Sequence, residues 1–227
     1  MPQLKKQNLS ASTQALVLFG AISLSFISLS LYLSSVTPSV AKARMDFASE
    51  QLSRRFEQLV RSHVAVAEAL AKRFHQQQAI PVEDNFDQMA DAIVGTFPGF
   101  YAINWADHNG VIRFVYPKEI NAAAKDQDLT QRTDVNTYLQ LARQSGTTTL
   151  TPLVSLYQGP KGFVSYTPVK IAGQHAGWVN SVFALEPLMR EVFLGADFGS
   201  ADVESLTADG SKSSFHYTPS GDGVGDI

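Results

Sequence analysis

Residues that could carry catalysis or bind a metal are scarce in this sequence, and those present lack the spacing that such chemistry needs. The five histidines, at positions 63, 75, 108, 175 and 216, include no pair four residues apart. The absence of cysteine excludes a thiolate nucleophile, a thiolate metal site and a disulfide framework. No P-loop, HExxH, GxSxG or EF-hand motif occurs. Because no nucleophile, base and orienting group can be nominated together, we expect neither catalysis nor a cofactor.

Aromatic residues are the candidates for ligand binding. Four of them fall on stretches that read as strands: Tyr101, Trp105, Tyr157 and Tyr166. Residue type alone favours filling a core, and contact with a small-molecule ligand is the alternative. Arg113 between Ile112 and Phe114 could anchor an acidic ligand, but a solvent-facing strand position is the preferred interpretation.

The polar run Asp107-His108-Asn109 has two interpretations. Its side chains could be metal ligands, but they precede Gly110 between two strand-like stretches. Asn-Gly between two strands is the strongest short-range signal of a hairpin, and the turn explains these residues without a metal. We therefore expect a turn here.

The elements that must position these residues predict an α+β domain. An apolar helix face follows a cap at Asp84 or Asn85, and a second helix is capped by Thr133 or Asp134 and ends at Gly146. A further helix is expected at 188–194. Five strands are expected at 99–106, 111–116, 147–157, 163–170 and 177–185. Short turns between the last three make an antiparallel meander, so we predict one sheet of about five strands with helices on one side.

A charge-free run from Gln7 to Ala41 contains the apolar stretch Ala15–Val36. At about 1.5 Å per residue, 22 residues cross the roughly 30 Å hydrocarbon core. A signal peptide cleaved near Ala41-Lys42-Ala43 is the alternative, and both interpretations export the rest of the chain. Residues 1–44 carry four positive charges and no acidic residue. Since the net charge of the whole chain is −3, the remaining residues carry a net charge of −7. No basic surface is left for nucleic acid there.

A long helical pattern follows over residues 40–78. One apolar row has the alternating three- and four-residue steps of a coiled-coil seam: Leu52, Phe56, Leu59, His63, Val66 and Leu70. This row predicts either a stalk that forms a homodimer or a helix packed once along a domain. A second row on an adjacent face, Val60, Val64, Ala67, Ala71 and Phe74, could hold the globular domain. His63 is expected to be a packed residue.

Several short motifs follow one another in a defined order between Asp128 and Met189. They are the helix end Ala142-Arg143-x-x-Gly146, Leu150-Thr151, Pro168-Val169 and Gly177. In this order and spacing the chain, from about Phe97 to Leu194, resembles the CHASE domain, the extracytoplasmic sensor module of bacterial and plant membrane receptors that include the cytokinin receptors. The resemblance implies a PAS-like sheet around a small-molecule pocket, a long N-terminal helix that dimerises, and a signal passed to a kinase or a cyclic-dinucleotide enzyme.

The resemblance also implies ligand residues, with departures. Cytokinin receptors hold the adenine of the hormone with an acid at the start of the capped helix and with a threonine two residues before the Pro-Val pair. Here Asp134 lies near the acid's position, although an ungapped alignment puts Val135 there, and Tyr166 replaces the threonine. Thr151 matches, and Tyr157 replaces an aliphatic residue. The resemblance therefore implies a more aromatic pocket and a ligand other than a cytokinin.

These observations predict the following organisation: a cytoplasmic leader 1–14, a transmembrane helix 15–36, a stalk helix 40–78, a PAS-like sensor domain 84–194, and a tail 195–227 in which Val203 and Leu206 could begin a strand of a further subdomain. We expect a periplasmic or extracellular ligand-sensing input domain of a single-pass inner-membrane receptor, of the sensor histidine kinase or diguanylate cyclase type. The alternatives are a membrane-tethered hydrolase or transferase and a structural anchor for a protein partner.

Overall fold

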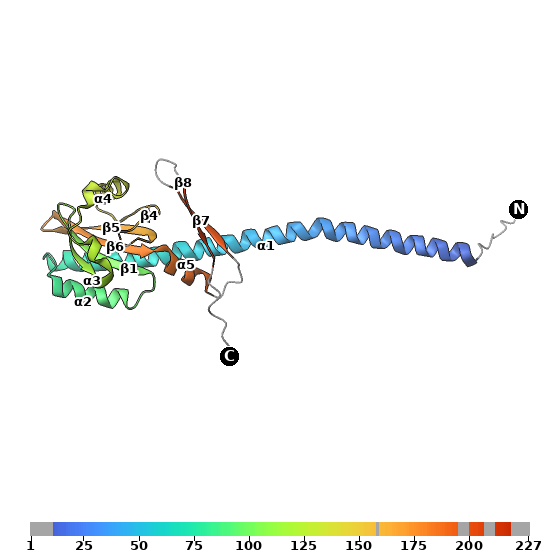
Figure 1. Cartoon of the computed structure of the whole chain (residues 1–227), viewed down its shortest axis with the longest axis horizontal. Helices are drawn as coiled ribbons and strands as arrows, with labels where there is room; N and C mark the ends of the chain where they lie inside the picture. The colour runs from blue at the N-terminus through green and yellow to red at the C-terminus, as the bar shows by residue number, and fades with distance from the viewer. Residues whose placement is uncertain (1–10, 158, 195–199, 207–211, 219–227) are drawn as a thin grey trace. The chain divides into compact units, whose positions relative to one another are not determined.

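The computed structural model describes residues 11–157, 159–194, 200–206 and 212–218 (Figure 1). Two compact units follow one another along the chain, Met1–Gln51 and Leu52–Ile227. Helix α1, Ala11–Gln77, begins in the first unit and ends in the second. The sheet and all other elements belong to the second unit.

The first part of α1 is described by its backbone alone, since the side chains of this helix are described at residue 40 and from residue 42 to its end. Among the described residues no helix combines the length and the apolar character that a membrane crossing needs. The side chains of Ala15–Val36 lie outside that set, as does most of the predicted leader 1–14, so the leader and the transmembrane helix stay predictions.

One antiparallel sheet forms the centre of the second unit. Its strands are β1 (Phe100–Asp107), β2 (Ile112–Tyr116), β3 (Thr149–Leu150), β4 (Val154–Ser155), β5 (Lys161–Ile171) and β6 (Gln174–Ala184). Their order is β2-β1-β6-β5-β3, and β4 also pairs with β5. The antiparallel α+β class is therefore confirmed, and so are the hairpin β1–β2 and the antiparallel pairing of the last strands.

The predicted strand 147–157 is two short strands instead of one. The backbone N–H of Thr151 still donates to Val164, at 2.9 Å, but Pro152 follows and has no N–H to continue the ladder. Pairing resumes at Val154 and ends in a turn in which the Leu156 N–H donates to the Pro160 carbonyl. Tyr157 lies in this turn, directly after the paired residues Val154 and Ser155.

Helices cover both faces of the sheet, which corrects the expectation of helices on one side (Figure 1). The first layer holds the C-terminal part of α1, α2 (Glu83–Val94) and α5 (Leu185–Phe193). The second layer holds η1 (Ala122–Ala124), η2 (Leu129–Gln131) and α4 (Thr133–Ser145), and the short α3 (Lys118–Asn121) precedes η1. The physical reason is in the strands, since both alternating sets of β6 residues are buried, as in a sheet covered on both sides.

The apolar row of α1 that resembles a coiled-coil seam packs against the chain's own domain. Leu52, Phe56, Leu59 and Val66 lie against the first core layer and Leu70 is buried in it. The packed role expected for His63 is confirmed: it is 2% exposed and its ring stacks on Phe100 with centroids 4.9 Å apart. This row is therefore not free to be a dimer seam, and a homodimer through this helix stays a prediction that must use other faces.

The β1–β2 turn confirms the hairpin interpretation of Asp107-His108-Asn109-Gly110. The Asp107 carboxylate accepts hydrogen bonds from the backbone N–H groups of Asn109 and Val111, at 3.0 and 3.1 Å. Arg113 is half-exposed and pairs with the same carboxylate at 2.7 Å, which agrees with a solvent-facing strand position. Among the described residues no group of three potential ligands could hold a metal ion.

Helix ends agree only partly with the sequence. Gly146 ends α4 with φ +71°, as expected of a glycine C-cap. Neither Thr133 nor Asp134 caps the start, because the N-cap residue is Arg132 and no side chain caps that end. Helix α2 likewise begins at Glu83 after Val82, one residue before the predicted cap.

A separate two-stranded hairpin follows α5. Strands β7 (Ala201–Leu206) and β8 (Lys212–Tyr217) pair antiparallel, which confirms the strand predicted around Val203. Tyr217 is buried in the first core layer and its ring lies 5.2 Å from that of Phe193. The glycine-rich end of the chain after residue 218 lies outside the described residues.

Candidate ligand site

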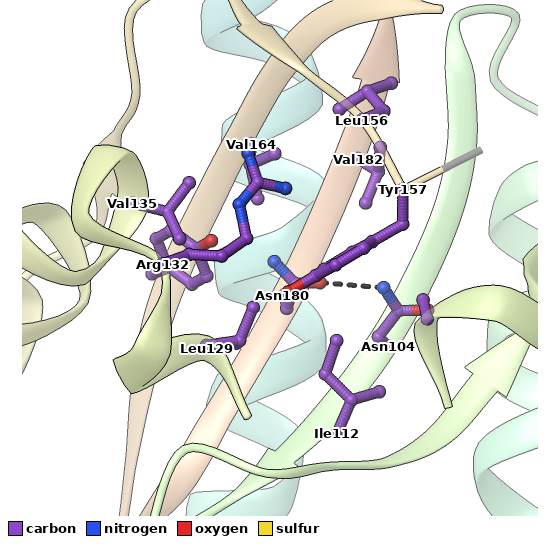
Figure 2. Close-up of a pocket in the computed structure, with 12 residues that line it drawn as sticks. Asn104, Ile112, Leu129, Arg132, Val135, Leu156, Tyr157, Val164, Asn180 and Val182 are labelled. Atoms are coloured by element: carbon purple, nitrogen blue, oxygen red, sulfur yellow. Dashed lines mark hydrogen bonds between the residues drawn. The ribbon is translucent and has the colours of Figure 1, made fainter. Parts of the chain in front are cut away.

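A pocket lies between the sheet and the second helical layer (Figure 2). The space between its lining atoms is about 310 Å³ when the part open to solvent at its mouth is included, and the part wide enough to hold a water molecule is about 20 Å³. Strands β1, β2, β5 and β6 form the floor, and η1, η2, the start of α4 and the segment after β4 form the walls. The lining residues are Asn104, Ile112, Ala124, Leu129, Arg132, Val135, Leu156, Tyr157, Val164, Tyr166, Asn180 and Val182.

Two asparagines face each other on the floor. Asn104 on β1 and Asn180 on β6 are directly paired across the strands, and the Asn104 Nδ2 group donates to Asn180 Oδ1 at 2.7 Å (Figure 2). Both residues are at most 2% exposed. Asn104 Oδ1 and Asn180 Nδ2 are buried without a hydrogen-bond partner within the protein. A buried polar atom without a partner costs about 1–3 kcal/mol, so a molecule that paired with these two atoms would recover that cost.

Arg132 stands at the wall beside Tyr157, at the junction of η2 and α4. Asp128 holds the start of η2, because its carboxylate accepts hydrogen bonds from the Thr130 backbone N–H and hydroxyl, at 2.9 and 2.6 Å. The Arg132 guanidinium binds the Asp134 carboxylate with two nitrogens and donates to the Ser155 carbonyl at 3.0 Å. Its carbon Cζ lies 4.8 Å from the centroid of the Tyr157 ring, a cation–π distance.

The protonation states of these groups follow from their surroundings. The hydrogen bonds of Asp134 raise the pKa of Arg132 above its usual value, so the guanidinium stays charged. Burial raises the pKa of the Tyr166 phenol far above 10 and that of Tyr157 less strongly, so both hydroxyls stay neutral at physiological pH. The lining therefore offers neutral hydrogen-bonding groups and one cation that already has an anionic partner.

The structure separates the six residues that the sequence nominated for ligand binding. Tyr157 and Tyr166 line the pocket. Asp134 does not line it, but it binds Arg132, which does. Tyr101 is half-buried against the second core layer and is not among the lining residues.

Trp105 and Thr151 have structural surroundings. Trp105 is 1% exposed in the first layer, on the opposite face of the sheet, with its ring 5.9 Å from that of Phe74. Thr151 is buried at the sheet edge, where its hydroxyl oxygen accepts from the Val164 backbone N–H at 3.0 Å. Neither side chain is brought to the pocket.

Three polar lining residues were not nominated from the sequence: Asn104, Asn180 and Arg132. A polar residue within a strand that is otherwise apolar was a detectable signal for both asparagines, since buried amides need partners. Arg132 carried no comparable signal, because an arginine before a helix is common at the surface. Its place in the pocket depends on the path of the segment after β4.

Known structures of the same fold belong to sensor domains. The extracellular ligand binding receptor from Desulfohalobium retbaense is 14% identical, with 71% of this chain and 29% of that chain covered and a TM-score of 0.56. The sensory domain of the Campylobacter jejuni chemoreceptor Tlp3 is 14% identical over 75% of this chain and 70% of that one, with a TM-score of 0.57. The sensor domain of the Vibrio cholerae histidine kinase DctB is 12% identical over 73% of this chain and 64% of that one, with a TM-score of 0.52. The present chain thus spans less than a third of the first of these proteins.

The family follows from the sequence comparison. A search among curated protein sequences finds no match. The family model described as the CHASE domain matches residues 49–216, well over half of the 227 residues. The match contains α1 from residue 49, the whole sheet, the pocket and most of the β7–β8 hairpin, and it agrees with the sensor-domain fold. The chain belongs to the CHASE domain family.

Proposed function

We propose that this chain is the extracytoplasmic input domain of a membrane-bound receptor and that it senses a small molecule bound in the pocket between β1, β5, β6 and the η2–α4 segment. The observation that carries the proposal is the combination of apolar walls with two buried, unpartnered amide atoms on the floor. Few, well-placed polar groups in a mostly apolar cavity are typical of small-molecule sites.

The fold and the family support the same function. Sensor domains of this fold were solved with small molecules, among them Pseudomonas aeruginosa PctB with L-Gln and Pseudomonas fluorescens CtaA with L-valine. For this chain we propose a receptor of the sensor histidine kinase or diguanylate cyclase type, with Ala15–Val36 as its membrane anchor. Binding without turnover is expected, because neither the sequence motifs nor the pocket residues supply a nucleophile with a base.

Ligand binding in this pocket should stabilise the fold and should be blocked by filling the pocket. Ala124 is buried in the lining, whereas its neighbour Ala123 is exposed. In a thermal-shift screen of the full chain, a stabilising compound at a hundredfold excess over Kd adds about 2.7 kcal/mol. Ala124→Leu should remove this stabilisation, and Ala123→Leu should keep it. Stabilisation that survives in Ala124→Leu, or a broad screen without any stabilising compound, would contradict the proposal.

The extracytoplasmic location predicts the topology of the chain. Because Lys5 and Lys6 precede the apolar stretch, the leader should stay in the cytoplasm and the domain should be exported. Alkaline phosphatase, which is active only after export, should be active when fused after Leu194. A cytoplasmic reporter such as β-galactosidase at the same position should be inactive, and the reverse result would overturn the location.

A further inference from the structure

The two asparagines on the pocket floor carry information about the ligand. We propose that the pocket selects an uncharged amide, and that Asn104 and Asn180 are the residues that recognise its N–H and C=O groups. The inference rests on the proposed ligand-sensing function and names the chemical class of the molecule that is sensed.

The hydrogen-bond inventory of the pair leaves one acceptor and one donor. The Asn104 Nδ2 group donates to Asn180 Oδ1, so Asn104 Oδ1 and Asn180 Nδ2 remain without a partner in the protein. Exchanging the oxygen and nitrogen positions of both amides reverses the direction of the bond and exchanges the roles of the two residues, but it still leaves one acceptor and one donor. The requirement for one donor and one acceptor therefore does not depend on how the two amides are oriented.

Only some functional groups satisfy both atoms. An amide supplies an N–H to Asn104 Oδ1 and a C=O to Asn180 Nδ2. A carboxylate has acceptors only, so it would leave Asn104 Oδ1 unsatisfied and place a negative charge beside it. An ammonium group has donors only, and it fails in the same way at Asn180 Nδ2. Each mismatch leaves a buried polar atom unpaired, which weakens binding.

The charges around the pocket also favour a neutral ligand. Arg132 is the charged residue of the lining, and its guanidinium is already bound to Asp134 and to the Ser155 carbonyl. Tyr157 and Tyr166 are neutral because burial raises the pKa of both phenols. A charged ligand would lose its hydration without gaining a free counter-ion in the pocket, and such burial is unfavourable.

Matched probes test the functional group on the full chain, purified in a mild detergent. 2-Piperidone is a neutral lactam, N-methyl-2-piperidone lacks its N–H, and 5-aminovalerate is the charged, ring-opened counterpart. We expect 2-piperidone to bind, as measured by saturation-transfer NMR titration, and the other two to bind at least tenfold more weakly. Equal binding of the three probes, tighter binding of 5-aminovalerate, or no binding of 2-piperidone would overturn the inference.

Substitutions in the pair test the residues. Asn180→Asp is nearly isosteric. With the amides oriented as in the structure it replaces the free donor with an acceptor, so it should weaken 2-piperidone binding at least tenfold and favour the cationic amidine 2-iminopiperidine instead. The double variant Asn104→Ala/Asn180→Ala, which adds no bulk, should also lose 2-piperidone and decides the outcome if Asn180→Asp does not fold. Ser181→Ala is the control, because Ser181 is buried beside Asn180 but pairs with Ile103 and belongs to the alternate set of β6 residues.

The failure of this inference can be distinguished from failure of the proposed function. Suppose that a screening compound no longer binds the Ala124→Leu variant but binds the double alanine variant with unchanged affinity. This result would overturn the amide inference and leave the ligand-sensing function standing. If no compound binds to the wild-type protein, both the amide inference and the proposed ligand-sensing function are overturned. A 2-piperidone affinity that is unchanged in the double alanine variant would assign the two asparagines a structural role only.

Discussion

Replacing Gly177 by alanine is expected to destabilise the domain by about 2–6 kcal/mol. Gly177 has φ +151°, and a Cβ atom there would lie 2.2 Å from the Ala106 carbonyl oxygen and 2.8 Å from the Trp105 ring. Backbone strain costs about 1–3 kcal/mol and overpacking against atoms that cannot move freely costs about 1–3 kcal/mol. Both costs fall on the pairing of β1 with β6, in the middle of the sheet.

The control for this prediction is Gly173→Ala in the β5–β6 turn. Gly173 has φ +77°, but a Cβ atom there would meet nothing within 4 Å, so the substitution carries the backbone strain alone, about 1–2 kcal/mol. Thermal unfolding of the two variants should show a clearly larger loss for Gly177→Ala. Equal losses would mean that the close approach of Trp105 to the β6 backbone does not matter, contrary to the structure.

The sequence predicted the elements well wherever local rules decide them. The Asn109-Gly110 turn and the glycine C-cap at Gly146 rest on backbone geometry, and both are confirmed. The strand predicted from Tyr101, Ile103 and Trp105 is also present, but both of its faces are buried, and Tyr101 packs on the second core layer while Ile103 and Trp105 lie in the first. The arrangement of the helices in two layers was harder to predict from the sequence. A strand with both faces apolar fits two covering layers, but periodicity does not say which helices cover which face.

The candidate site was harder to predict because it depends on which strand residues share a face. Tyr166, Asn180 and Asn104 come together only once β1, β6 and β5 are adjacent and in register. Aromatic type alone placed Trp105 in the same group, although residues 104 and 105 point to opposite sides of a strand. Knowledge of the strand order would have separated them.

The partner of the apolar row on α1 was ambiguous from the sequence for a related reason. A three-four spacing of apolar residues fits a helix against a sheet as well as a helix against its copy, because both require one continuous stripe. The structure resolves this for Leu52 to Leu70, which lie against or within the first core layer. His63 shows the same outcome, since its ring nitrogens lie 2.8 and 2.6 Å from the carbonyl oxygens of Leu59 and Pro98 of the same chain.

Trp105 and Tyr157 give the sharpest test of the two-layer arrangement, because the sequence proposed the same role for both. Trp105 is 1% exposed and packs edge-on against Phe74 in the first layer. Tyr157 is half-buried and lines the pocket beside Arg132 in the second layer. One side chain therefore supports folding, and we propose that the other contacts the ligand.

Trp105→Ala should lower the free energy of unfolding by about 3–5 kcal/mol, because it leaves a large void between α1 and the sheet. Where the variant remains folded, its affinity for a pocket ligand should change little, since the pocket is on the other side of the sheet. Tyr157→Ala should have the opposite profile, with a stability loss below about 1.5 kcal/mol, as expected for a partly exposed ring, and at least tenfold weaker binding. Denaturant unfolding and ligand titration on both variants measure the two effects. Ligand affinity lost in Trp105→Ala and kept in Tyr157→Ala would place the site on the first layer and overturn the pocket as the sensor site.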